Sequence, residues 1–114
     1  MKSDALHMTL LFDYYGDLLT EKQRLCFDLH YNQDFSLGEI AGEAGITRQG
    51  VHDTLARAEA ALENFEDKIG CIAGAEQTRA ALTEIREAGE ALRALPGAEA
   101  QAEKILAAAD RIKE

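Results

Sequence analysis

The sequence predicts an all-α fold in which an N-terminal helical domain containing a helix-turn-helix precedes a C-terminal antiparallel helical hairpin. Three observations lead to this prediction. Aromatic residues make up only 6% of the 114 residues, whereas Ala, Leu, Glu and Arg are frequent, and this composition favours helices over strands. At two places Ser or Thr stands three positions before Glu or Gln, a spacing that marks helix N-termini. In the C-terminal third, apolar residues recur at steps of three and four, which is typical of paired helices.

The first helix is expected over residues 4–19, because apolar residues recur there every three or four positions. The residues expected to face the core are Leu6, Leu10 or Leu11, Tyr14 or Tyr15, and Leu18. A second helix should begin after Thr20, which forms a capping box with Gln23, and run to about residue 30 or 31.

The next two helices form the predicted helix-turn-helix, at about residues 36–58. Ser36 and Glu39 make a second capping box, and Gly45 should end this short helix. Thr47 then caps a longer helix that continues to about residue 65 or 69. Its core-facing residues, at steps of four, three and four, are Val51, Leu55, Ala58 and Leu62.

The match to a helix-turn-helix has a steric basis. Two helices that cross at a wide angle need a small residue where they come closest, which Ala41 supplies, and a turn residue that tolerates positive φ, which Gly45 supplies. The small core between the helices is expected to contain Ile40, Ile46, Val51 and Leu55.

If this unit binds DNA, its second helix enters the major groove with the N-terminus first. The candidate residues for contact with nucleic acid or a partner are Thr47, Arg48, Gln49, His52, Asp53 and Arg57. In the alternative interpretation, Arg48 and Arg57 are solvated or pair with Asp53 and Glu59, and the unit is a surface for docking another protein.

The C-terminal segment is expected to form a separate hairpin. Gly70 and Gly74 indicate a break, which divides the chain into a helix-turn-helix domain at 1–73 and a hairpin at 74–114. Pro96 and Gly97 turn the chain between the two helices. The seam positions are Leu82, Ile85, Gly89 and Leu92 in one helix and Ala102, Ile105, Ala109 and Ile112 in the other. Because the hairpin buries so narrow a stripe poorly, we expect it to dock on the N-terminal core or on a second copy, and we favour a homodimer.

Charge restricts the functions that are open to the chain. Twelve basic and 21 acidic residues give a net charge of −9, which opposes binding to a phosphate backbone. The sequence contains no apolar run of the roughly 20 residues that span a bilayer. We therefore expect a cytoplasmic protein without membrane insertion.

No pattern in the sequence indicates an enzyme. Asp13 and Asp17 lie one turn apart, but no His or Cys joins them at the spacing of metal ligands. The three histidines are scattered, the two cysteines form no C-x-x-C pair, and there is no phosphate-binding glycine loop. We expect no catalytic residue, no metal and no cofactor.

Three segments of the chain resemble the YlxM family of small helix-turn-helix proteins. They are Met8 to Gln23 (MTLLFDYYGDLLTEKQ), Asp34 to Ala41 (DFSLGEIA) and Thr47 to Asp53 (TRQGVHD). The similarity covers about residues 6–72, and the helix-turn-helix also resembles region 4 of sigma factors. Family members usually carry bulkier residues where this chain has Gly42, Ala44 and Gly50.

The resemblance implies a regulatory role in the signal recognition particle pathway, through contact with the particle's GTPase or RNA. Two other hypotheses stay open on the sequence. One is a transcriptional regulator that binds duplex DNA as a dimer, with half-sites about one helical turn apart. The other is a protein-interaction module that the C-terminal hairpin dimerises.

Overall fold

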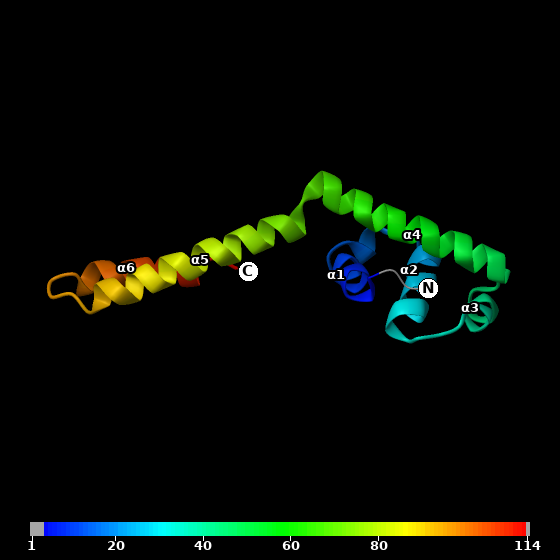
Figure 1. Cartoon of the computed structure of the whole chain (residues 1–114), viewed down its shortest axis with the longest axis horizontal. Coiled ribbons are helices and arrows are strands. Elements are labelled where there is room, and N and C mark those ends of the chain that lie inside the picture. Colours follow the sequence, from blue (N-terminus) through cyan, green and yellow to red (C-terminus); the bar gives the residue numbers. More distant parts are fainter. Residues whose placement is uncertain (1–3, 114) are drawn as a thin grey trace. The chain divides into compact units, whose positions relative to one another are not determined.

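The computed structural model describes residues 4–113, and within this range every regular element is helical. The predicted all-α fold is confirmed. The chain divides into two compact units between Cys71 and Ile72. The α-helices of the first unit, labelled in Figure 1, are α1 (Ala5–Tyr15), α2 (Glu21–Phe27), α3 (Leu37–Ala44) and α4 (Arg48–Ile69). Between them lie the 3₁₀ turn η1 (Gly16–Leu18) and the π-helical turn η2 (Asp28–Asn32). The second unit contains α5 (Cys71–Arg93) from its second residue onwards and α6 (Glu99–Asp110).

The buried face of α1 differs from the expected one. Met8, Leu11 and Tyr15 are buried, and Leu19 follows them into the core, whereas Leu6 and Leu18 are 81% and 57% exposed. The prediction for Leu6 and Leu18 was therefore wrong, and of the open alternatives Leu11 and Tyr15 face the core. Adjacent apolar pairs allow two frames one residue apart, so periodicity alone does not choose between them. Long-range contacts of Tyr15 favour the observed frame.

The starts of α2 and α3 are as predicted. The Thr20 hydroxyl accepts a hydrogen bond from the Gln23 N–H (3.2 Å), and the Gln23 side chain accepts one from the Thr20 N–H (3.0 Å). Ser36 and Glu39 make the same pair of bonds at the start of α3. Each capping box satisfies backbone N–H donors that a helix N-terminus leaves unpaired. Because only two residues three positions apart are needed, the sequence alone reveals such a helix start.

The turn between α3 and α4 has the geometry that the sequence predicts. Gly45 has φ 69°, in the left-handed region, and its N–H bonds to the Ala41 carbonyl. Ile40, Val51 and Leu55 are buried between the two helices, and Ile46 packs against them while half-buried. The predicted helix-turn-helix is confirmed.

Helix α4 is the element on which the first unit is assembled. Its stripe of Val51, Leu55, Ala58 and Leu62 is buried, as predicted, with no member more than 6% exposed. α1, α2 and α3 all pack against α4 (Figure 1). The core of the unit therefore forms along a single long helix.

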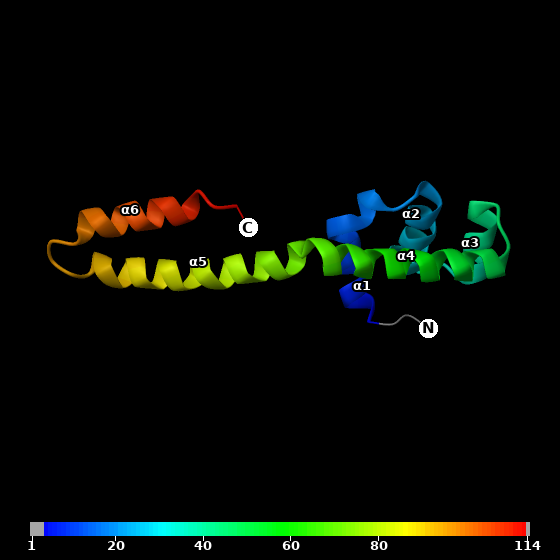
Figure 2. The same cartoon turned by 90° about the horizontal axis from the view of Figure 1, so that it is seen from above.

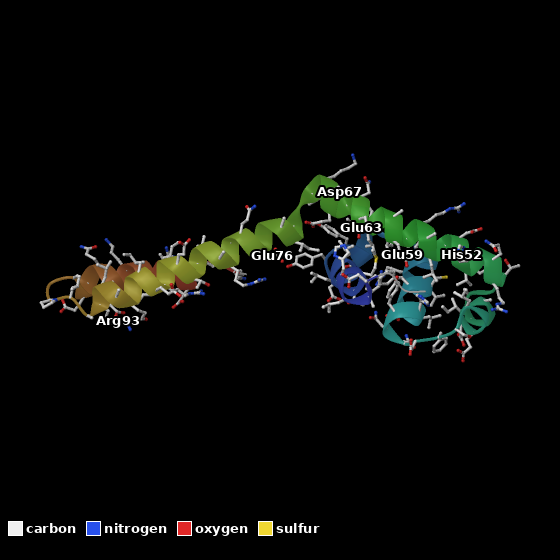
Figure 3. The ribbon with its side chains drawn as sticks, viewed as in Figure 1. His52, Glu59, Glu63, Asp67, Glu76 and Arg93 are labelled. Atoms are coloured by element: carbon white, nitrogen blue, oxygen red, sulfur yellow. The ribbon has the colours of Figure 1, made fainter. Side chains whose placement is uncertain are left out.

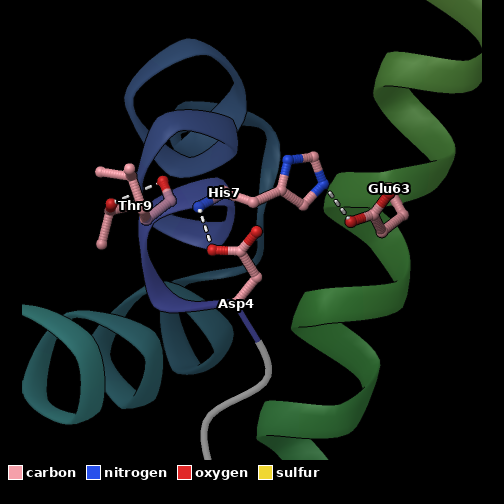
Figure 4. A network of polar contacts seen from close by, with 5 residues as sticks. Asp4, His7, Thr9 and Glu63 are labelled. Carbon is pink, nitrogen blue, oxygen red and sulfur yellow. Dashed lines mark hydrogen bonds and ion pairs between the residues drawn. The ribbon is translucent and has the colours of Figure 1, made fainter.

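Three carboxylates of α4 also make polar contacts with two tyrosine hydroxyls and one imidazole of the preceding elements. Glu59 accepts a hydrogen bond from the Tyr31 hydroxyl, and Glu66 accepts one from the Tyr15 hydroxyl at 2.5 Å. His7 Nε2 lies 2.6 Å from Glu63 Oε1, as Figure 4 shows. These contacts join residues far apart in the sequence and fix α1 and η2 along α4.

Helices α5 and α6 form the predicted antiparallel hairpin (Figure 2). The expected break at Gly74 was wrong, because Gly70, with φ 72°, ends α4 and α5 begins at the next residue. Gly74 lies inside α5, where a glycine costs about 1 kcal/mol relative to alanine and is tolerated.

The seam of the hairpin is only partly the predicted one. Leu82, Gly89, Ala102 and Ala109 are buried, as expected, and Leu106 is buried as well. Ile85 and Ile112 are 42% and 48% exposed, so their predicted place in the seam was wrong. Gly89 accounts for the burial of Leu106, because a Cβ there would lie 2.8 Å from Leu106 Cδ2. Leu106 occupies the space above Gly89 and lies in the seam beside the predicted Ala102 and Ala109.

Two glycines of the helix-turn-helix provide a matched stability test. Gly45→Ala forces an L side chain into the left-handed region and should lower the free energy of unfolding by about 1–2 kcal/mol. Gly42→Ala should raise it by about 0.5–1 kcal/mol, because Gly42 is inside α3 and its Cβ would have nothing within 4 Å. Denaturant unfolding of the full chain measures both changes, and changes of the same sign would contradict this account.

Candidate nucleic-acid or partner interface

The six candidate residues lie at the N-cap and in the first three turns of α4, the second helix of the helix-turn-helix. All of them are exposed: Thr47, Arg48, Gln49, His52, Asp53 and Arg57. In Figure 3 His52 marks this end of α4, and Glu59, Glu63 and Asp67 follow along the same helix. The folding of α3 against α4 therefore leaves the N-terminal turns of α4 open to a partner.

Thr47 has a structural task within this surface. Its hydroxyl accepts a hydrogen bond from the Gly50 N–H at 2.9 Å, which caps α4. An N-cap of this kind typically contributes about 1 kcal/mol. Thr47 thus sets where α4 begins and so where the other candidate side chains lie.

Asp53 engages two of the other candidate residues. Gln49 Nε2 donates a hydrogen bond to Asp53 Oδ1 at 3.0 Å, and His52 Nδ1 lies 3.5 Å from the same oxygen. A Gln that bonds adenine bidentately uses the same Nε2, together with its Oε1, whereas a His can also contact a base through Nε2, which does not contact Asp53. A bidentate contact of Gln49 with a base would therefore require Asp53 to release its amide, and the Asp53 carboxylate would repel nearby phosphates.

Arg48 and Arg57 do not form the ion pairs that the alternative interpretation offered. Asp53 contacts Gln49 and His52, Glu59 accepts from Tyr31, and within residues 4–113 no salt bridge joins either arginine to a carboxylate. The two arginines stand nine residues apart, about two and a half turns, so they lie on opposite sides of α4. They are two separate solvated charges and make no continuous basic patch.

The charge balance of the helix-turn-helix is slightly negative. Residues 36–58 contain two arginines against Glu39, Glu43 and Asp53, a net charge of −1. Two nearby basic side chains are committed elsewhere, since Lys22 Nζ donates to the Ala44 carbonyl at 2.8 Å and Arg24 lies 3.5 Å from Asp17. The contact of Lys22 with the end of α3 spans 22 positions, and no sequence signal indicates it.

A small hollow beside the candidate surface was also not foreseen. It has a volume of about 170 Å³. Its lining comes from η2, α3 and α4 and consists of His30, Leu37, His52, Leu55, Ala56 and Glu59. Because these residues come from three elements, only the folded chain brings them together. Apolar walls with a carboxylate and two imidazoles suit a side chain that is apolar along its length and polar or cationic at its tip.

The acidic pair of α1 and η1 and the buried cysteine form no catalytic arrangement within residues 4–113. Asp13 and Asp17 are exposed, and Asp17 faces Arg24. Burial raises the pKa of the Cys26 thiol, which keeps it protonated and unreactive. Within the described part of the chain, no group of three or more His, Cys, Asp or Glu side chains is arranged to hold a metal ion. None of the described helices is long and apolar enough to cross a membrane.

Two helices joined at a left-handed glycine, with the second presenting its first turns to solvent, define a helix-turn-helix protein. The family described as "Putative helix-turn-helix protein, YlxM / p13 like" matches residues 2–96. The chain belongs to this family.

Curated relatives support the assignment over most of the chain. A UPF0122 protein of Thermoanaerobacter sp. (strain X514) is 48% identical over 93 residues, which is 82% of this chain and 80% of the relative. One of Desulforamulus reducens is 45% identical over 105 residues, 87% of this chain and 90% of the relative. One of Halalkalibacterium halodurans is 47% identical over 88 residues, 77% of this chain and 81% of the relative.

The capping box of α3 predicts a pH dependence of stability. Hydrogen bonds from Ser36 lower the pKa of the Glu39 carboxyl in the folded chain. The carboxylate therefore stabilises the fold above its unfolded pKa of about 4.3, and this contribution is lost as the pH falls through the lower, folded value. Glu39→Gln keeps an acceptor but cannot ionise, so the stability advantage of the wild type should shrink on acidification.

The measurement is the free energy of unfolding of both proteins from about pH 7 to about pH 3. Glu43→Gln, on the same helix, controls for the loss of one negative charge. Parallel pH profiles of the wild type and Glu39→Gln would contradict the assignment.

Proposed function

We propose that this chain is a cytoplasmic regulatory protein and not an enzyme, and that it acts in the signal recognition particle pathway by docking its helix-turn-helix on a component of the particle. The pathway is the one that the resemblance to the YlxM family implies. One observation, the charge of the first unit, favours a protein partner, the particle's GTPase, over the particle's RNA. Residues 4–71 contain five basic and thirteen acidic residues, a net charge of −8, which repels a phosphate backbone and attracts a basic protein surface.

The geometry of α4 agrees with a protein partner. Asp53 accepts a hydrogen bond from Gln49 and lies 3.5 Å from His52 Nδ1, so a carboxylate stands among the side chains best suited to bases. The hollow beside His52 offers a place for a partner's side chain, and such pockets are where binding energy concentrates in protein interfaces.

Duplex DNA binding is the alternative function, and one observation favours it. The N-terminal turns of α4 are exposed in the position that a recognition helix takes in the major groove, and Arg48 and Arg57 flank them without salt bridges in the described chain. In this case the protein would act as a transcriptional regulator.

The first test is a binding comparison. Fluorescently labelled full-length protein is titrated with the particle's GTPase, the particle's RNA and random duplex DNA, at low and at physiological salt. Saturable binding to the GTPase that persists at physiological salt is expected. Persistent binding to the RNA alone would move the docking site to Arg48 and Arg57, and enrichment of a sequence from random duplexes would establish the DNA-binding alternative.

A pair of double variants locates the docking surface. Glu43→Gln with Asp53→Asn removes two negative charges from the helix-turn-helix and should weaken binding to the GTPase by about tenfold, since each exposed ion pair contributes up to about 1 kcal/mol. Asp13→Asn with Asp67→Asn removes the same charge from exposed positions outside it and should have a smaller effect. Equal effects of the two would show attraction by net charge alone and contradict a specific docking site.

A further inference from the structure

The hairpin of α5 and α6 has one charged face and one apolar face. Ion pairs cross between the helices on the charged face, where Arg93 lies 2.8 Å from Glu103 and Arg86 lies 3.8 Å from Asp110. Figure 2 shows the two helices side by side, with the loop joining them at one end. Successive residues turn by about 100° around a helix, so these pairs fix which side of each helix is charged.

On the opposite side the same 100° steps place two apolar stripes. α5 contributes Ala81, Ile85, Ala88 and Leu92, and α6 with its last turn contributes Ile105, Ala108 and Ile112, with the polar Gln101 at the N-terminal end of the α6 stripe. Ile112 belongs to this turn because its N–H bonds to the Ala109 carbonyl. Ile85 and Ile112 are 42% and 48% exposed, and Leu92 and Ile105 are half-buried.

This unit buries too little to be stable as an isolated hairpin. Among residues 72–113 the buried ones are Leu82, Gly89, Ala102, Leu106 and Ala109, of which only two are leucines. Units of about 40 residues rarely build a sufficient core alone and usually gain stability from disulfides, metals or association. Covering its apolar face with further protein would therefore stabilise the hairpin.

We propose that a second copy of the chain covers this face, so that two hairpins form a four-helix bundle with two-fold symmetry. The spacing supports a matching partner, because Ile85 and Leu92 stand seven residues apart, as do Ile105 and Ile112. A seven-residue spacing on both surfaces lets side chains of one copy fit between those of the other. In a two-fold interface each copy contributes the same patch.

The distribution of charge also supports a second copy at this place. Residues 72–113 contain six basic and seven acidic residues, a net charge of −1, whereas residues 4–71 carry −8. Two copies meet with little repulsion at the hairpin, and they repel each other strongly at the first unit. The exposed apolar residues of α1, including Leu6 and Leu10, therefore suit a second copy less well.

The test is the oligomeric state of the full chain by sedimentation equilibrium over a wide range of concentrations. The wild type is expected to be a dimer whose melting temperature rises with concentration. Ile85→Glu with Ile112→Glu should raise the dimer dissociation constant at least about 100-fold, because unpaired charges would be buried in the interface. Thr83→Glu with Ala107→Glu places the same two charges on the same two segments but on the charged side, and should leave the dimer intact.

Far-UV circular dichroism confirms that each variant is still helical. A wild type that is monomeric at every concentration would overturn the proposal. So would a dimer that survives Ile85→Glu with Ile112→Glu but dissociates in Leu6→Glu with Leu10→Glu, because the interface would then lie on α1. Neither result bears on the partner of the helix-turn-helix, which the GTPase titration tests separately.

Discussion

The buried stripe of α4 is the constraint on which the first unit depends. Val51, Leu55, Ala58 and Leu62 lie on one side of a helix of 22 residues, and α1, α2 and α3 reach a common core only by packing against that side. The candidate surface is the exposed N-terminal end of the same helix. The packing of the core therefore also determines which α4 side chains face solvent, because any rotation of α4 that changed the exposed side chains would expose the buried stripe.

The charged side chains of α4 have different roles in different parts of the helix. Glu59, Glu63 and Glu66 accept hydrogen bonds or ion pairs from Tyr31, His7 and Tyr15, so the carboxylates in its middle and C-terminal turns serve the fold. Burial and the bond to Glu66 raise the pKa of Tyr15, so its hydroxyl remains a donor at neutral pH. The N-terminal turns keep side chains that are free to meet a partner, apart from their contacts with Asp53.

Local sequence signals predicted the elements that are stabilised locally. The two capping boxes and the left-handed Gly45 act within four residues, and the structure contains all three. Side-chain choices that depend on distant partners were less predictable. The frame of α1 rests on contacts such as Tyr15 with Glu66, 51 positions apart, and the seam of α6 depends on the gap that Gly89 leaves for Leu106. At the candidate site, residue types indicated an exposed helix end, but not the hollow lined from three elements.

The charges of the two units lead to one further step about function. A positive potential at the recognition helix favours DNA binding by a helix-turn-helix, because phosphate contacts supply a large share of the affinity. Here Asp53 lies among the side chains that would read bases, and the unit around it carries −8. Dimerisation through the nearly neutral hairpin would bring together two such units, doubling the total negative charge without adding positive charge near either α4. The proposed dimer would therefore suit two basic protein surfaces better than two half-sites on a duplex, in line with the proposed protein partner.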